Sequence, residues 1–138
     1  MTYALDTSII SFLLRPSRNP EVVSKFNEMI KNGHEYVIPP FCHYEVYWHL
    51  LRKKATTQLN IFERLFDNSQ QNFNMGETDF ILSARLKADL MEKGTPIGNK
   101  DADIFIAAYC MNNGYTLVTD NTSDFERIDN LSIINWKE

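Results

Sequence analysis

The sequence predicts a single α/β domain, residues 1–138, built around a mainly parallel sheet. Short apolar runs alternate with longer amphipathic segments, which is the pattern of strands connected by helices. Prolines and glycines separate these segments. The composition, 43% hydrophobic and 23% charged, is that of an ordinary globular protein, and 138 residues suit one hydrophobic core.

Two strands and four helices are expected before residue 70. The first strand is a short apolar run directly before Asp6. A helix with an apolar face follows and ends at the proline-containing stretch 15–20, and the next helix ends at Gly33. Pro39 and Pro40 suit the first turn of a third helix. In chain order, the elements are a strand at 3–5, helices at 7–14 and 21–32, a strand at 36–38, and helices at 39–54 and 57–66.

Three more strands are expected beyond residue 70. Gly94 and Pro96 end one helix, and Gly114 ends another directly before the clearest apolar run of the chain. In chain order, the elements are a strand at 73–75, helices at 77–93 and 101–113, and strands at 115–118 and 132–135.

Polar residues directly after the strands indicate where a site would lie. Ligands of open parallel sheets bind beyond the carboxyl ends of the strands. Asp6 follows the first strand, and Thr119, Asp120 and Asn121 follow the strand at 115–118. A helix N-cap is the alternative interpretation of Asp6. Thr119 could hold a neighbouring carboxylate through its hydroxyl.

Glu45 lies inside the third helix among bulky side chains. A partly buried carboxylate needs a partner, so Glu45 is a second candidate site residue. His49 and Arg52 follow on the same helical face, and a salt bridge to either is the alternative interpretation.

Asp101 and Asp103 open the helix at 101–113, where acids also stabilise a helix without any ligand. Asp103 precedes the apolar Ile106 and Ala107 by three and four residues, so it should be the more inward of the two acids.

Asp120 and Asp124 flank a polar segment that also suits a turn. If Asp6, Glu45, Asp103 and Asp124 converge, they would repel one another without a counter-charge. Mg²⁺ or Mn²⁺, which prefer carboxylate and water oxygens, would resolve that repulsion. Phosphodiester hydrolysis is the reaction that such ions assist.

Other chemistries lack their motifs. The chain has no Walker-type loop, dinucleotide fingerprint or Gly-x-Ser-x-Gly elbow. His34, His43 and His49 show no zinc-ligand spacing with Cys42 or Cys110, which are expected to be buried free thiols.

The net charge of −4 argues weakly against nucleic acid as a ligand. Apart from the four proposed site acids, however, acidic and basic residues balance at 14 each. The run Arg52, Lys53 and Lys54 could meet phosphates, and the alternative is a solvated helix end.

These residues resemble the PIN-domain ribonucleases and, more closely, the VapC toxins of bacterial toxin–antitoxin pairs. The similarity spans nearly the whole chain in order. It rests on the helix containing Glu45 and on the segments Leu5–Ser8, Asp101–Ala108, Leu117–Phe125 and Leu131–Trp136.

The resemblance implies a PIN-like, three-layer α/β/α fold with a five-strand sheet, and Mg²⁺- or Mn²⁺-dependent endoribonuclease activity. Asp6 and Asp103 match the principal metal-binding acids, and Glu45 and Asp124 match the acids that bind directly or through water. The supporting polar positions are Thr7, Thr119, Asp120, Asn121 and Asp101. Asp120 remains the alternative fourth acid, and Ser8 stands where asparagine is commoner.

The resemblance also implies partners. These are an RNA substrate such as a tRNA or another structured RNA, a VapB-like antitoxin and a second copy of the chain. His49, Arg52 and Lys53 are candidates for RNA contacts. An apolar antitoxin segment would occupy a groove formed by Ile10, Phe12, Leu13, Tyr47, Trp48 and Leu51, although core packing must claim several of these residues.

Two alternatives to a nuclease stay open. One is phosphoryl transfer with Asp6 as the nucleophile, and the other is a non-catalytic PIN-like module that binds RNA or protein. With neither a long apolar run nor a secretory signal, the chain is expected in the cytoplasm and not in a membrane.

Overall fold

A computed structural model describes residues 1–97 and 101–138, and a parallel sheet forms its centre. Four strands in the order β2-β1-β3-β4 make up the sheet within these residues. All neighbours pair in parallel, with Tyr3 opposite both Tyr36 and Thr116. The strands are β1 (Thr2–Leu5), β2 (Glu35–Val37), β3 (Thr116–Val118) and β4 (Ile133–Ile134).

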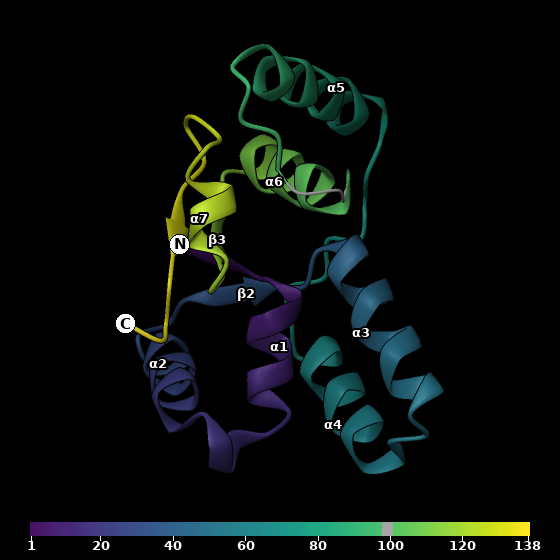
Figure 1. Ribbon diagram of the computed structural model, residues 1–138. Helices are drawn as coiled ribbons and strands as arrows, with labels where there is room; N and C mark the ends of the chain where they lie inside the picture. Colours follow the sequence, from purple (N-terminus) through teal and green to yellow (C-terminus); the bar gives the residue numbers. More distant parts are fainter. Residues whose placement is uncertain (98–100) are drawn as a thin grey trace.

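Helices cover both faces of this sheet (Figure 1). Helices α1 and α2 lie on one side, α6 lies on the other, and α5 packs on the outside of α6. Helices α3 and α4 lie beside α1. The helices are α1 (Thr7–Leu13), α2 (Pro20–Lys31), α3 (Pro40–Arg52), α4 (Thr56–Asp67), α5 (Glu77–Glu92), α6 (Asp101–Asn113) and α7 (Thr122–Phe125). The three-layer α/β/α prediction is confirmed.

The helix ends follow from local chemistry. Proline occupies the first turn of α2 and of α3, where its missing N–H costs nothing. Gly33 and Gly114 have φ of 80° and 69° at the turns from α2 into β2 and from α6 into β3. These are left-handed conformations that glycine adopts without strain. A 3-10 turn at Pro16–Arg18 fills the predicted break after α1.

The core lies on both faces of the two central strands. Leu5, Leu117 and Val118 are fully buried in the sheet, and α6 packs Ile106 and Tyr109 into the same core. The thiols of Cys42 and Cys110 are free and buried, as predicted. No helix within the described residues is long and apolar enough to cross a membrane.

The predicted strand at residues 73–75 is wrong, so four strands replace the expected five within the described residues. Side-chain contacts hold this stretch as an irregular connection between α4 and α5. The Tyr109 hydroxyl donates to the Asn72 carbonyl at 2.7 Å, and the Asn72 amide donates to Tyr115 Oη at 3.0 Å. Phe73 packs edge-on against His43 and Phe66 with its own side chain half exposed. Its apolar character therefore serves helix packing and not sheet formation.

Candidate functional site

The carboxyl ends of β1 and β3 bring Asp6 and Thr119 together. The Asp6 amide donates to the Val118 carbonyl at 3.0 Å, which extends the pairing of the two strands by one residue. The Thr119 hydroxyl then donates to Asp6 Oδ2 at 2.7 Å. The prediction that Thr119 holds a carboxylate through its hydroxyl is therefore confirmed.

Asp6 is a buried acid, with only 7% of its surface exposed. Besides the Thr119 hydroxyl, its carboxylate accepts the Thr7 amide at 2.9 Å and the Cys42 thiol at 3.8 Å. Burial raises the pKa of Asp6, the donors from Thr119 and Thr7 oppose this increase, and the nearby charge of Asp120 adds to it. The carboxylate therefore occupies a position where a positive charge would stabilise its ionised form.

Glu45 reaches the same place from α3. Its Oε1 accepts the Thr7 hydroxyl at 3.1 Å, so Thr7 touches Asp6 through its backbone and Glu45 through its side chain. The alternative salt bridge is wrong, since neither His49 nor Arg52 lies within ion-pairing distance of Glu45. Glu45 is half-buried, as its bulky neighbours predicted.

Asp124 joins the network from the other side. The backbone N–H of Asn121 donates to the Thr119 hydroxyl at 3.0 Å, and the side-chain Nδ2 of Asn121 donates to Asp124 Oδ2 at 3.1 Å. Arg127 lies 3.8 Å from Asp124 Oδ1. Asn121 and Asp124 belong to the start of the short helix α7 and not to a simple turn. One chain of hydrogen bonds thus connects Glu45, Asp6 and Asp124.

Asp101 and Asp103 both lie in the first turn of α6 but differ in exposure. Asp101 is exposed and pairs with Lys87 at 2.9 Å, whereas Asp103 is half-buried. The prediction that Asp103 is the more inward acid is confirmed. The stacked rings of Phe41 and Phe105, 4.9 Å apart, fix this end of α6 against the start of α3.

The described side chains do not form a closed group of three or more His, Cys, Asp or Glu ligands. Hydroxyl and amide groups separate the acids instead, which limits the repulsion between their charges. Mg²⁺ binds through one or two carboxylates and keeps several waters, so an open arrangement of acids fits its chemistry. Ser8 Oγ, buried two residues after Asp6 with no partner among the described residues, is a group that a bound water would satisfy.

The sequence interpretation missed two residues of this network, Cys42 and Arg127. Cys42 precedes Glu45 by three residues, so the helical spacing of α3 already placed both on one face. Burial, followed by the charge of Asp6, raises the pKa of Cys42, and its thiol therefore stays protonated as a donor. Nothing in the pattern around Arg127 indicated its approach to Asp124.

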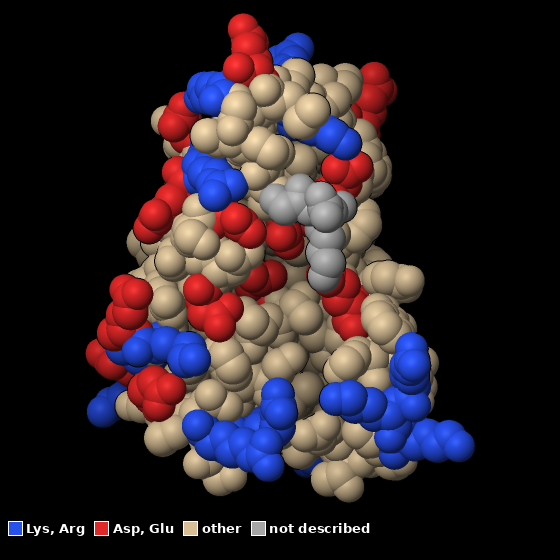
Figure 2. All heavy atoms as spheres, viewed as in Figure 1, with Lys and Arg blue, Asp and Glu red and all other residues tan. Residues whose placement is uncertain are grey.

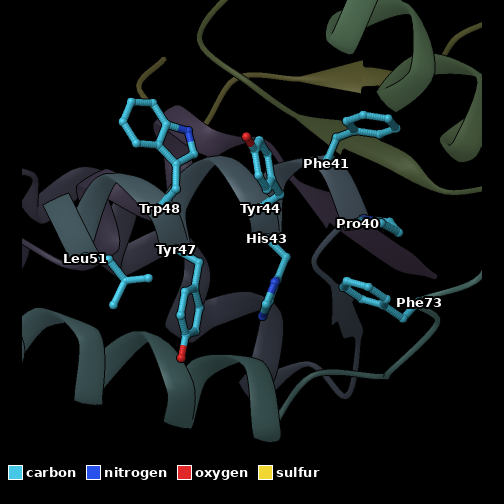
Figure 3. A pocket seen from close by; sticks show the side chains of 8 residues that line it. All are labelled: Pro40, Phe41, His43, Tyr44, Tyr47, Trp48, Leu51 and Phe73. Atoms are coloured by element: carbon cyan, nitrogen blue, oxygen red, sulfur yellow. The ribbon is translucent and has the colours of Figure 1, made fainter.

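A wide apolar hollow of about 690 Å³ lies on the outer face of α3. Figure 3 shows His43 and Tyr47 pointing toward α4, with Tyr44 and Trp48 on the opposite side. The hollow is lined by Pro40, Phe41, His43, Tyr44, Tyr47, Trp48, Leu51 and Phe73.

This hollow corrects the predicted antitoxin groove. Tyr47, Trp48 and Leu51 line it, but Ile10 is fully buried, and Phe12 and Leu13 pack against the core. The predicted groove therefore divides into core residues on α1 and a partly exposed apolar surface on α3.

Acidic and basic side chains are mixed over the upper part of the face seen in Figure 2, but its middle and its lower border differ in charge. Acidic side chains gather around the hollowed middle of this face, where the sheet edge and the start of α6 lie. Basic side chains lie along its lower border, over the end of α1 and the turn between α3 and α4.

Comparison with known proteins gives a consistent result. A family profile described as "PIN domain" matches residues 3–131. "Ribonuclease VapC2" of Rickettsia felis is 26% identical over 136 residues, which cover 99% of this chain and 98% of that protein. "tRNA(fMet)-specific endonuclease VapC" of Salmonella typhimurium is 38% identical over 56 residues, 41% of each chain.

Solved structures have the same fold. A chain of the VapBC-1 structure from nontypeable Haemophilus influenzae superposes with a TM-score of 0.83 at 23% identity, with all of both chains covered. VapBC-5 from Mycobacterium tuberculosis, described as a member of the VapBC family of toxin–antitoxin systems, gives 0.62 at 18% identity, covering 97% of this chain and 96% of that one.

Proposed function

Because the chain belongs to the PIN-domain family, we propose that it is a metal-dependent endoribonuclease and the toxin of a toxin–antitoxin pair. The observation that carries this proposal is the hydrogen-bonded chain from Glu45 through Asp6 to Asp124 at the carboxyl edge of the sheet. Hydrolysis of RNA also agrees with the ribonuclease names of the relatives.

Asp6 and Asp103 are the proposed principal ligands of Mg²⁺ or Mn²⁺, with Glu45 and Asp124 binding directly or through water. When bound, the ion would activate a water molecule and stabilise charge on the phosphate. The chain itself fixes the acids. Thr119 and Thr7 orient the Asp6 carboxylate, and Thr7 also orients Glu45. Asn121 orients Asp124.

The proposed substrate is a tRNA or another structured RNA, on the basis of the tRNA-specific Salmonella relative. The proposed partner is a VapB-like antitoxin, because the similar folds include members of toxin–antitoxin systems. Tyr44, Trp48 and Leu51 leave between 44% and 64% of their surfaces exposed on the α3 hollow. Such clustered apolar surface is typical of protein contacts, with an antitoxin or with a second copy of the chain.

Asp6→Asn tests the proposed chemistry. The variant should lose RNA cleavage and growth inhibition, because the buried carboxylate is replaced by a neutral amide that binds hard cations poorly. Cleavage of total tRNA would be followed on gels with Mg²⁺, with Mn²⁺ and with a chelator. The matched control is Asp129→Asn, which removes an exposed acid that pairs with Lys93.

Circular dichroism would show that both variants are folded. Cleavage by wild type in chelator, or full activity of folded Asp6→Asn, would contradict the proposal. A stable beryllofluoride adduct at Asp6 without RNA cleavage would instead support phosphoryl transfer.

A further inference from the structure

A groove between α1 and α3 begins at the candidate site. Its first part, a hollow of about 210 Å³, is lined by Thr7 from α1 and by Glu45 from α3. A second hollow of about 80 Å³ continues from it. The two hollows share Ser11, Leu14, His49 and Leu50, so they are neighbours on the surface, and together they are called the α1–α3 groove.

The charge of this α1–α3 groove changes sign along its length. Glu45 stands at the end beside Asp6, whereas the far hollow is lined by Arg15 and Lys53 and by no acidic residue of the described chain. Neither Arg15 nor Lys53 forms an ion pair with a described carboxylate. Figure 2 shows basic side chains gathered over the end of α1 and over the turn after α3, where the groove ends.

The groove has a length that suits a short stretch of nucleic acid. Glu45 and Lys53 are eight residues apart along α3 and its C-cap, which at the helical rise is about 12 Å. Successive phosphates of a single strand are separated by a whole sugar, so a groove of this length accommodates only a few nucleotides. The exposed cations at its far end would therefore meet phosphates a few nucleotides from the one held at the acids.

We propose that the α1–α3 groove carries the sugar–phosphate backbone of a single-stranded RNA segment leading away from the scissile bond. Arg15 and Lys53 contact its phosphates, and His49, which lines both hollows, lies between these cations and the acids. The proposal rests on the proposed nuclease function and adds to it the direction of the substrate strand.

The cations at the far end would attract both RNA and an acidic peptide, and Glu45 and Asp6 without a bound cation would repel both. RNA is the occupant that the proposed function favours. A strand with one phosphate at the cation-loaded acids continues past them, and the adjoining groove leads to Arg15 and Lys53. The cations of the far hollow differ from the run at residues 52–54. Arg15, on the other side of the groove, lines the far hollow together with Lys53, whereas Arg52 lines neither hollow.

The test compares the double variant Arg15→Gln/Lys53→Gln with Arg18→Gln/Arg64→Gln. Both remove two exposed cations, and neither Arg18 nor Arg64 lines the groove. Binding of 5′-fluorescein oligouridylates of four, eight and twelve nucleotides would be measured by anisotropy at several salt concentrations. The Asp6→Asn background prevents cleavage during the measurement.

The groove variant should reduce the slope of log Kd against log salt by about 1.4, since each single-strand phosphate contact contributes about 0.7. The control pair should leave the slope unchanged. In the active protein, the groove variant should raise KM for cleavage of the twelve-nucleotide probe and leave kcat nearly unchanged, because phosphate contacts away from the reacting bond bind the ground and transition states alike.

Equal salt slopes for the two double variants would overturn the proposal, as would an effect confined to binding of the cognate antitoxin. The outcomes separate this proposal from the nuclease function. If wild type cleaves RNA while the groove variant matches the control, only the groove proposal fails. If the groove variant weakens oligouridylate binding but wild type cleaves no RNA, the nuclease proposal fails and the groove is only a binding site for single-stranded RNA.

Discussion

Thr119→Val tests whether one buried hydroxyl holds the candidate site together. Valine has nearly the same shape, so the change removes the hydroxyl and leaves little cavity. The hydroxyl is fully buried, donates to Asp6 at 2.7 Å and accepts the Asn121 backbone amide at 3.0 Å. The variant therefore loses one hydrogen bond to a carboxyl group and leaves a partly buried amide without an acceptor.

The expected cost follows from those two contacts. Together, the lost hydrogen bond and the unpaired amide should lower the free energy of unfolding by about 2–4 kcal/mol. Unfolding entropy of about 2.1 cal/mol/K per residue makes this roughly 7–14 °C in Tm for a domain of this size. Urea titration and thermal melting in chelator would measure both quantities without a contribution from bound metal.

Thr116→Val, at the start of the strand β3 that Thr119 follows, is the matched control. Its hydroxyl pairs with Ser132 at 3.1 Å in an exposed position, so its loss should cost less than about 1 kcal/mol. Equal stability of the two variants would show that the hydrogen bonds of Thr119 to Asp6 and Asn121 do not stabilise the fold as argued. Thr119→Val should also raise the Mn²⁺ concentration for half-maximal RNA cleavage about 10–100-fold, because Asp6 loses the hydroxyl that orients it.

Three further predictions concern the fold around the site. Asp79→Ala should lower the free energy of unfolding by about 2–3 kcal/mol in urea, because Asp79 caps α5 and accepts the Asn112 amide at 2.8 Å. Burial raises the pKa of Tyr36 to about 12, so the folded state holds this proton more tightly than the unfolded state does. The stability that this protonated phenol contributes is fully present below pH 10 and is lost as pH rises toward about 12. Tyr36→Phe should therefore make the free energy of unfolding depend less on pH in this range. Burial also raises the pKa of Cys42 and of Cys110, so both thiols should react with Ellman's reagent only at the rate of unfolding.

The strand ends were predictable from sequence because their signal is local. An apolar run followed by a polar residue places that residue at the carboxyl edge, and parallel pairing then brings such edges together. Asp6 and Thr119 were both placed in this way, and they touch in the structure. The inward position of Asp103 was equally local, since it depends only on the periodicity of one helix.

Other features depend on contacts between distant segments. Residues 73–75 have the composition of a strand, but Asn72 is tied to Tyr109 and Tyr115, which lie more than 30 positions away. Glu45 has His49 and Arg52 on the same helical face and still pairs with Thr7, because the packing of α1 on α3 brings that hydroxyl closer. Helical periodicity identifies the possible partners of a side chain but does not choose among them.

The environment of Asp6 distinguishes a site acid from a helix cap. Capping α1 requires only that the side chain accept the Thr7 amide, which an exposed Ser or Asn would do at lower cost. The fold instead buries Asp6, adds donors from Thr119 and Cys42, and leaves Asp120 close enough to raise its pKa. Burial of an acid beside another acid is unfavourable unless a positive charge joins them. The donors therefore hold a carboxylate in place for a cation, which agrees better with the proposed nuclease than with a structural cap.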